Sequence, residues 1–285
     1  MLLDEHDEAG QGPEKAVLAA AWGATAEEAG LLRQLRPERL PRHVAVIMDG
    51  SGRWARQRQR PRVAGHLAGT RTVRTVVETC ARLQVQALTL YAFSAENWRR
   101  PQGEINFLMR LLRRYLRSET PELNRQNIRL EAIGRIQELP APVQQEIAAA
   151  CAATRGNTGM VLSLALNYGA RRELVDACQA LVDRARARGE LATLKITEEA
   201  LQAQLYTAGL PDPDLLIRTS GEMRVSNFLL WQIAYAEIWV TPVLWPDFER
   251  RHLLQALVDY ERRERRFGGL SPASAASAKH GAGGA

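Results

Sequence analysis

Short apolar runs and longer stretches of helical periodicity alternate along the chain. The apolar runs occupy residues 44–48, 87–93, 128–133, 160–166, 214–218 and 237–241, and their composition is typical of buried strands. Between them, apolar residues recur with helical spacing over residues 63–83, 104–124, 141–154, 171–188, 226–235 and 249–266, and a shorter helix is expected over 197–206. The pattern therefore predicts strands that alternate with helices from one end of the chain to the other.

This order predicts an α/β fold, because strands joined through helices form a mostly parallel sheet with helices on both faces. We expect a single domain with a six-stranded central sheet over residues 41–270, since no repeat or linker divides that region. Residues 1–40 are interpreted as an N-terminal extension with one amphipathic helix around 31–40. The Ser/Ala/Gly-rich residues 271–285 are interpreted as a disordered tail.

The helix expected over residues 104–124 has a wide apolar stripe. Its members are Ile105, Leu108, Met109, Leu112, Tyr115 and Leu116. Such a stripe is most often plain core, and the sharper alternative is the wall of an apolar tunnel. Sequence alone leaves both interpretations open.

The most informative run follows the first strand. Asp49 stands where the strand should end, and Gly50 and Gly52 let the backbone turn sharply and approach a ligand closely. Ligands of open α/β sheets bind at the carboxyl ends of strands. A carboxylate there, beside glycine amides and Arg53, suits a phosphate group bound together with a metal ion.

Arginines continue past this run, at positions 53, 56, 58, 60, 62, 71 and 74, and no acidic residue lies between Asp49 and Glu78. A solvated basic face is the plain interpretation, whereas the lone carboxylate at the strand end favours an anion site. The run lacks the Gly-Lys-Ser/Thr ending of a Walker loop and is not Gly-x-Gly-x-x-Gly.

Polar residues also gather after two other strands. Ser94, Asn97 and Arg100 follow the second strand, while Arg218, Arg224 and Ser226 lie at or after the end of the fifth. Parallel strands end at one edge of a sheet, so these residues should share one rim with Asp49 and Arg53. Two groups of arginines on one rim suggest two anionic groups. Glu237 stands where the sixth strand begins, and a carboxylate in that apolar run needs a metal or an arginine as its partner.

The amino-acid composition limits which classes of protein this chain can belong to. The chain has 285 residues with 46% hydrophobic and 25% charged positions, which is typical of a globular protein with a real core. A net charge of +6 favours an anionic partner. Cys80, Cys151 and Cys178 show no metal-binding spacing, so we interpret them as small buried hydrophobes in a reducing compartment.

Targeting and membrane signals are weak. The acidic N-terminus does not resemble a signal peptide. The stretch 228–245 is apolar but contains Gln232, Glu237 and Pro242, so a core helix followed by a core strand is the preferred interpretation over a membrane span.

Eight stretches together resemble the cis-prenyltransferase family, most closely the bacterial undecaprenyl diphosphate synthases. They are HVAVIMDGSGRWA, GHLAGT, ALTLYAFSAENWRRP, GNTG, LNYGAR, LIRTSGEMRVSNFLLWQIAYAEIW, LWPDF and RRFGG, and they run in the family's order from His43 to Gly269. The combination is specific to that family.

The resemblance implies a reaction and its partners. Isopentenyl diphosphate condenses with an allylic diphosphate, usually farnesyl diphosphate, in the presence of Mg²⁺, and each added unit carries a Z double bond. The implied product is a long-chain polyprenyl diphosphate such as undecaprenyl diphosphate, the precursor of a lipid carrier for cell-wall polysaccharide. The resemblance further implies a cytoplasmic homodimer with peripheral contact to the inner face of the plasma membrane through its lipid product.

The resemblance also implies roles for individual residues. Asp49 and Glu237 hold the metal, and Asn97 lies near the proton that the incoming unit loses. Gly50, Ser51, Gly52, Arg53, Arg62 and His66 hold the allylic diphosphate, and Arg218, Arg224 and Ser226 hold the isopentenyl diphosphate. Ser94, Glu96, Asn97, Trp98 and Arg100 form a mobile loop, and Trp54, Ala95 and Val225 complete the substrate-binding set. Small Ala92 leaves room for elongation near the tunnel mouth.

Two positions depart from the family's pattern. Ser51 replaces the usual Asn, and Ser220 replaces a usual Gly. A serine hydroxyl still bonds a phosphate oxygen, so we expect altered rate or metal handling and no loss of function.

Other function classes fit less well. A short- or medium-chain Z-prenyl diphosphate synthase of the same family is the main alternative. An all-E prenyl synthase needs aspartate-rich motifs, and the chain has no Asp-Asp pair. A nucleic-acid-binding module would interleave aromatics with its arginines, which this chain does not do, so no nucleic-acid partner is expected. An inactive regulatory subunit is disfavoured by the retention of the residues Asp49, Arg53, Asn97, Arg218, Arg224 and Glu237.

Overall fold

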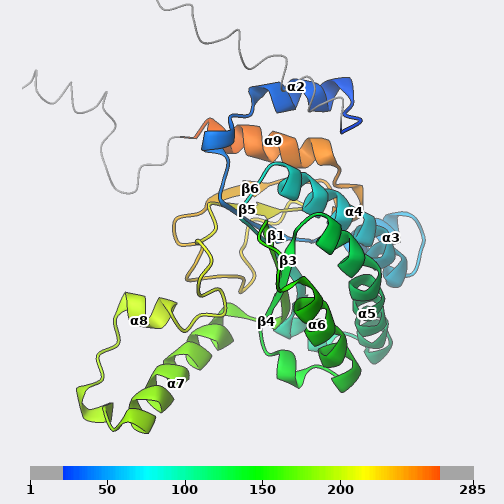
Figure 1. Ribbon diagram of the computed structural model, residues 1–285. Coiled ribbons are helices and arrows are strands. Elements are labelled where there is room, and N and C mark those ends of the chain that lie inside the picture. Colours follow the sequence, from blue (N-terminus) through cyan, green and yellow to red (C-terminus); the bar gives the residue numbers. More distant parts are fainter. Residues whose placement is uncertain (1–21, 264–285) are drawn as a thin grey trace, which may run out of the picture.

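The computed structural model describes residues 22–263, which build one parallel sheet with helices on both faces (Figure 1). The strands are β1 (His43–Ile47), β2 (Ala87–Ser94), β3 (Arg129–Ile133), β4 (Val161–Tyr168), β5 (Leu215–Arg218) and β6 (Glu237–Val240). They are ordered β3-β4-β2-β1-β5-β6, and every neighbouring pair is parallel. The predicted α/β fold with a six-stranded sheet is confirmed.

Eight α-helices connect and cover these strands within residues 22–263. They are α2 (Ala26–Gln34), α3 (Ser51–Gln57), α4 (Arg62–Arg82), α5 (Gln102–Arg125), α6 (Ala141–Thr154), α7 (Ala170–Arg188), α8 (Glu198–Gln202) and α9 (Arg250–Glu261). In Figure 1, α4, α5 and α6 lie to one side of the sheet and α7 and α8 to the other. The predicted helix at 141–154 has the bounds of α6.

Strand β1 lies at the centre of both hydrophobic cores. Val44 and Val46 belong to the larger core, which α4, α5, α6 and α9 cover, while Ala45 and Ile47 belong to the smaller core on the opposite face. Successive side chains of a strand point to opposite faces, so a strand covered on both sides must be apolar at every position. This explains why the run before Asp49 is uninterrupted.

The register of the central strands sets the position of the site. Ile47 of β1 pairs with Arg218, the last residue of β5, so Asp49 emerges beside Arg218 at the carboxyl edge of the sheet. Ser94 ends β2 on the other side of β1. The predicted rim of strand ends is therefore present.

One helix prediction was wrong, and one helix was not predicted. Residues 226–235 form a series of turns instead of a helix, because Ser226, Asn227 and Leu229 adopt positive φ angles of 47°, 60° and 47° that an α-helix cannot contain. Conversely, the arginine-rich stretch after Gly50, where no helix was predicted before residue 63, forms the separate helix α3.

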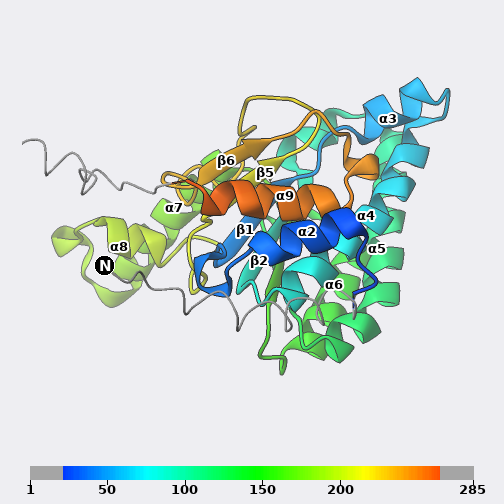
Figure 2. The ribbon, with the colours of Figure 1, turned by 90° about the horizontal axis from the view of Figure 1, so that it is seen from above.

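Part of the predicted N-terminal extension belongs to the folded body. Helix α2 starts five residues before the expected helix and lies alongside α9, as Figure 2 shows. Leu31, Leu32 and Leu35 join the larger core, and the backbone N–H of Arg36 donates to Glu261 at 2.7 Å. The division at residue 40 stays a prediction, and the predicted tail 271–285 lies outside the described residues.

The remaining sequence predictions concern cysteines and membranes. Cys80 is buried, Cys151 is half-buried and Cys178 is exposed, so the prediction of burial was wrong for Cys178 on the outer face of α7. No helix within residues 22–263 combines the length and the apolar character needed to cross a bilayer.

Candidate active site

A cavity of about 680 Å³ opens beneath the carboxyl edge of the sheet, between α4, α5 and strands β2 and β4. Its volume is in the range of ligand pockets, roughly 300–1,000 Å³. Ten of the residues singled out from the sequence line it: Asp49, Ser51, His66, Ser94, Glu96, Asn97, Arg100, Arg218, Arg224 and Ser226. The structure therefore brings together side chains that are up to 177 positions apart in the sequence.

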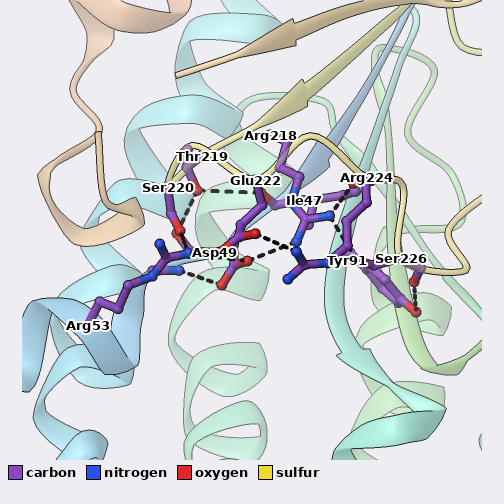
Figure 3. A network of polar contacts seen from close by, with 11 residues as sticks. Ile47, Asp49, Arg53, Tyr91, Arg218, Thr219, Ser220, Glu222, Arg224 and Ser226 are labelled. Carbon is purple, nitrogen blue, oxygen red and sulfur yellow. Dashed lines mark hydrogen bonds and ion pairs between the residues drawn. The ribbon is translucent and has the colours of Figure 1, made fainter. Parts of the chain in front are cut away.

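Asp49 lies at the mouth of this cavity, between two arginines (Figure 3). Its Oδ2 accepts a hydrogen bond from Arg218 Nη2 at 3.0 Å and lies 3.9 Å from Arg53 Nη2. Gly50 follows with a φ of 109°, and a Cβ there would come within 3.0 Å of both Leu244 and Ser220. The glycine is needed for this turn, which leaves the Asp49 carboxylate partly exposed beside the cavity.

Arg218 is the buried cation of the site. Its side chain is 4% exposed, and Nη1 donates to Ser226 Oγ at 2.8 Å and to the carbonyl oxygen of Arg224. A buried charge needs an opposite charge and hydrogen bonds, and Asp49 supplies the charge. The Nε of Arg218 is buried without a hydrogen-bond partner in the described chain. Arg218 thereby fixes the loop that carries Arg224 and Ser226.

Glu222 connects the two arginines that point toward the mouth. It accepts a hydrogen bond from Arg53 Nη2 at 3.0 Å and another from Arg224 Nη1. Arg53 also donates to the hydroxyl of Ser220. Glu222 was not among the predicted site residues, although an acid between two arginines of one predicted rim was an available signal.

A second charged cluster forms where α4 meets the start of α5. Glu104 is 8% exposed and lies 2.8 Å from Arg100 Nη1, 3.2 Å from His66 Nε2 and 3.3 Å from Arg62 Nε. Gly52 permits this arrangement, since a Cβ there would lie 3.2 Å from the Arg62 guanidinium. Glu104 was not among the predicted site residues, and its spacing of four residues from Arg100 was the only local signal.

Burial and charge set the protonation of this second cluster. Burial raises the pKa of Glu104, but the His66 hydrogen bond and the charges of Arg100 and Arg62 outweigh it, so the net pKa lies below the usual value. Burial lowers the pKa of His66 more than Glu104 raises it. At neutral pH the cluster therefore holds a carboxylate, a neutral imidazole and two guanidinium groups.

The segment after β2 closes one side of the mouth. Asn97 Oδ1 accepts the Ser94 backbone N–H at 3.2 Å, which closes the short 3₁₀ helix Ala95–Arg99. Glu96 accepts a hydrogen bond from Asn227 Nδ2 at 2.9 Å, so this segment is joined to the loop after β5. Asn227 is a further residue that the candidate set omitted.

Several predicted site residues lie away from the cavity. Trp54 donates to Asp247 at 2.7 Å beneath Arg58, and Trp98 donates to Asn167 at 2.7 Å and packs on Phe93. Both indoles therefore support the fold. Ala95 and Val225 do not border the cavity either.

Glu237 does not join Asp49. It is the first residue of β6, opposite Leu215, whereas the rim lies at the other end of these parallel strands. Arg263 Nη1 donates to Glu237 Oε2 at 2.7 Å. In this chain, Asp49 and Glu237 thus lie at opposite ends of the sheet, and the predicted shared metal site is not formed by this pair.

The interior of the cavity is apolar. Leu90 of β2, Leu164 and Leu166 of β4, and the α5 stripe line it, and the α5 contribution is Leu108, Met109, Leu111, Leu112 and Tyr115. The stripe on α5 is therefore a cavity wall over much of its length, while its members Ile105 and Leu116 are buried in core. A mouth with one carboxylate and several arginines above an apolar interior suits a ligand with an anionic head and a hydrocarbon tail.

Comparison with known proteins agrees with this geometry. The family described as "Putative undecaprenyl diphosphate synthase" matches residues 47–268. An isoprenyl transferase of Heliobacterium mobile is 52% identical over 86% of this chain and 94% of its own length. One from Geobacter sulfurreducens is also 52% identical, over 83% of this chain and 96% of its own.

Solved structures share the fold. Lavandulyl diphosphate synthase from Lavandula x intermedia, in complex with dimethylallyl diphosphate, aligns with a TM-score of 0.78 at 38% identity and covers 81% of this chain and 99% of its own. A probable undecaprenyl diphosphate synthase from Campylobacter jejuni aligns with a TM-score of 0.67 at 34% identity, over 80% and 98% of the two chains. With identity at this level across most of its length, the chain belongs to the undecaprenyl diphosphate synthase family and is a prenyltransferase.

Proposed function

We propose that this prenyltransferase condenses isopentenyl diphosphate with an allylic diphosphate, with farnesyl diphosphate as the preferred starter, and forms a long-chain polyprenyl diphosphate such as undecaprenyl diphosphate. The observation that carries the proposal is the apolar cavity whose mouth joins Asp49 to two groups of arginines. The solved relative from Lavandula, bound to dimethylallyl diphosphate, supports an allylic diphosphate as one ligand.

The two diphosphates are assigned to different sides of Asp49. Arg53, with Gly50, Ser51 and Gly52, takes the allylic diphosphate, and the cluster of Arg62, His66 and Arg100 around Glu104 lies on the same side. Arg218, Arg224 and Ser226 take the isopentenyl diphosphate. Breaking the allylic C–O bond builds negative charge on the departing diphosphate, and fixed guanidinium groups stabilise that charge. The leucine-lined interior excludes water from the carbon that becomes positive.

Magnesium fits this site through Asp49. Proteins usually hold Mg²⁺ with one or two carboxylates together with substrate phosphates and waters. No group of three or more His, Cys, Asp or Glu side chains gathers within residues 22–263, so Asp49 with a bound diphosphate is the arrangement that the side chains support. When bound, the ion supplies charge neutralisation on the leaving diphosphate.

Asn97 is assigned a position near the proton that the incoming unit loses. It lines the cavity within the segment after β2, and its Oδ1 is held by the Ser94 N–H. This leaves the Asn97 Nδ2 amide group to contact the isopentenyl diphosphate and orient its reacting carbon.

We also propose a cytoplasmic homodimer that contacts the membrane through its lipid product. The edge strand β6 supports the dimer, because Ile238 on it is 46% exposed and Tyr235 just before it is 74% exposed. Uncovered edge strands with apolar side chains are commonly protected by association.

The test is turnover with radiolabelled isopentenyl diphosphate, farnesyl diphosphate and Mg²⁺. Asp49→Ala should reduce turnover by about 10²–10³-fold, as the loss of one preorganised stabiliser of transition-state charge does in other enzymes. Asp183→Ala, an exposed acid on α7, is the control and should leave turnover unchanged. Near-normal turnover of Asp49→Ala with retained folding contradicts the proposal. Chromatography of the products distinguishes a long chain from the shorter Z-prenyl alternative.

A further inference from the structure

Ser220 combines a strained backbone with a buried position in the candidate site. Its φ is 79°, in the left-handed region, and the residue is 4% exposed. Left-handed geometry is unfavourable for residues with a Cβ, and Gly221 next to it takes the same φ without that cost. Strained residues at functional sites persist where the surrounding structure holds them in place. This combination makes the side chain of Ser220 a candidate for a contribution that glycine cannot make.

The contribution is a hydrogen-bond acceptor for Arg53. Arg53 Nη2 donates to the Ser220 hydroxyl, and the two side chains point toward each other from α3 and the loop after β5 (Figure 3). The backbone N–H of Ser220 donates to the carbonyl oxygen of Val243 at 2.8 Å, and the neighbouring Thr219 hydroxyl donates to the carbonyl oxygen of Asp49 at 2.6 Å. The Ser220 hydroxyl therefore stands on a fixed backbone beside Asp49.

Holding Arg53 in this way preserves its ability to bind a ligand. All of its hydrogen bonds and ion pairs within residues 22–263 use Nη2, toward Ser220, Glu222 and Asp49. Nε and Nη1 remain as donors for an anion. A free arginine side chain loses rotamer entropy when it is ordered, and an anchored one has already lost part of it.

We propose that Ser220 is a positioning residue, whose hydroxyl holds the Arg53 guanidinium in place for the allylic diphosphate. This inference rests on the proposed function for the identity of the ligand. The neutral hydroxyl orients the guanidinium without neutralising it, whereas Glu222 competes with the ligand for the same cation. The left-handed strain at position 220 is the structural cost of placing an acceptor there.

Two variants separate the hydroxyl from the strain. Ser220→Ala removes the hydroxyl and keeps the Cβ, while Ser220→Gly removes both. Both variants should raise KM for farnesyl diphosphate by roughly three- to tenfold, the range expected when one ordinary intramolecular hydrogen bond is lost. KM for isopentenyl diphosphate should change less than twofold, because Arg218 and Arg224 keep their contacts. Ser220→Gly alone should also raise Tm by about 2–4 °C.

The matched control is Gln84→Gly, which relieves a φ of 59° at an exposed turn after α4. It should raise Tm without changing either KM. Unchanged KM for farnesyl diphosphate in both Ser220 variants overturns the inference, as does a rise in Ser220→Gly alone, which would assign the effect to loop flexibility.

Calorimetric titration with inorganic pyrophosphate provides a second readout that does not depend on turnover. Weaker binding by three- to tenfold in both variants supports the positioning role, and equal binding in all proteins contradicts it. An inactive wild-type protein refutes the proposed function while the titration still decides the role of Ser220.

Discussion

Glu104 offers the sharpest test of how the second charged cluster is held together. Its carboxylate is buried and contacts Arg100, His66 and Arg62, so Glu104→Ala leaves three polar groups without their shared acceptor. The Arg100 contact is a charged hydrogen bond to a 30% exposed partner and contributes about 1.5 kcal/mol. The bond with neutral His66 contributes about 1 kcal/mol, and the pair with exposed Arg62 about 0.5 kcal/mol.

The expected loss of unfolding free energy for Glu104→Ala is therefore about 3 kcal/mol, which lowers Tm by roughly 6–12 °C for a domain of this size. Glu104→Gln keeps an acceptor oxygen but loses the charge, so it should lose about half as much. Glu27→Gln, which removes an exposed acid paired with Arg251, is the control and should shift Tm by less than about 1–2 °C.

The pH dependence of this effect follows from the direction of the pKa shift. The pKa of Glu104 is lower in the folded protein than its ordinary 4.5, so its stabilising contribution is complete above that pH and is lost as the pH falls through the folded-state value. Burial also lowers the pKa of His66, whose contribution is complete above 6.5 and declines in acid. Thermal unfolding should therefore be followed by circular dichroism at pH 7.5 and pH 3.5. A Tm deficit for Glu104→Gln that stays equal at both pH values would refute the reasoning.

Two further predictions concern the cavity wall and a tight turn. Tyr115 lines the cavity about 16 Å along α5 from Glu104, at 1.5 Å per residue, so Tyr115→Ala should extend the cavity and shift the products toward longer chains on reversed-phase chromatography. Unchanged products, with Arg114→Ala as the exposed control, would contradict this role. Gly134 has a φ of 111°, and a Cβ there would overlap the carbonyl oxygen of Leu166, so Gly134→Ala should destabilise the fold by about 3 kcal/mol or more in urea unfolding. An unchanged free energy of unfolding would show that the backbone of β4 at Leu166 can shift to make room for the added Cβ.

Local pattern predicted much of this fold because its central elements are covered on both sides. The uninterrupted apolar run before Asp49 and the helical spacing over 141–154 both reflect burial. Burial can be predicted from sequence because buried positions are mostly occupied by apolar residues. Strand ends were predictable for the same reason, and with them the meeting of Asp49, Asn97 and Arg218 on one rim. The register of the sheet then fixed which of these side chains touch.

Backbone strain, and contacts between residues that are far apart in the chain, could not be predicted from the sequence. Residues 226–235 are apolar with helical spacing, but the left-handed geometry at Ser226 and Asn227 depends on contacts with Arg218 and Glu96 from other elements. Glu104 meets His66 across 38 positions, which no local pattern encodes. The separation of Glu237 from Asp49 follows from the parallel direction of β6, which only the sheet order makes certain.

The charged side chains around Asp49 stand at strand ends, on the loop after β5 and on α3, whereas the hydrocarbon lining of the cavity comes from α4, α5, β2 and β4. Substitutions at the apolar lining positions of α5 can thus reshape the space for a growing chain while the side chains around Asp49 stay where they are. Related proteins can therefore differ in the chain length of their products while they keep the same charged groups for the reaction.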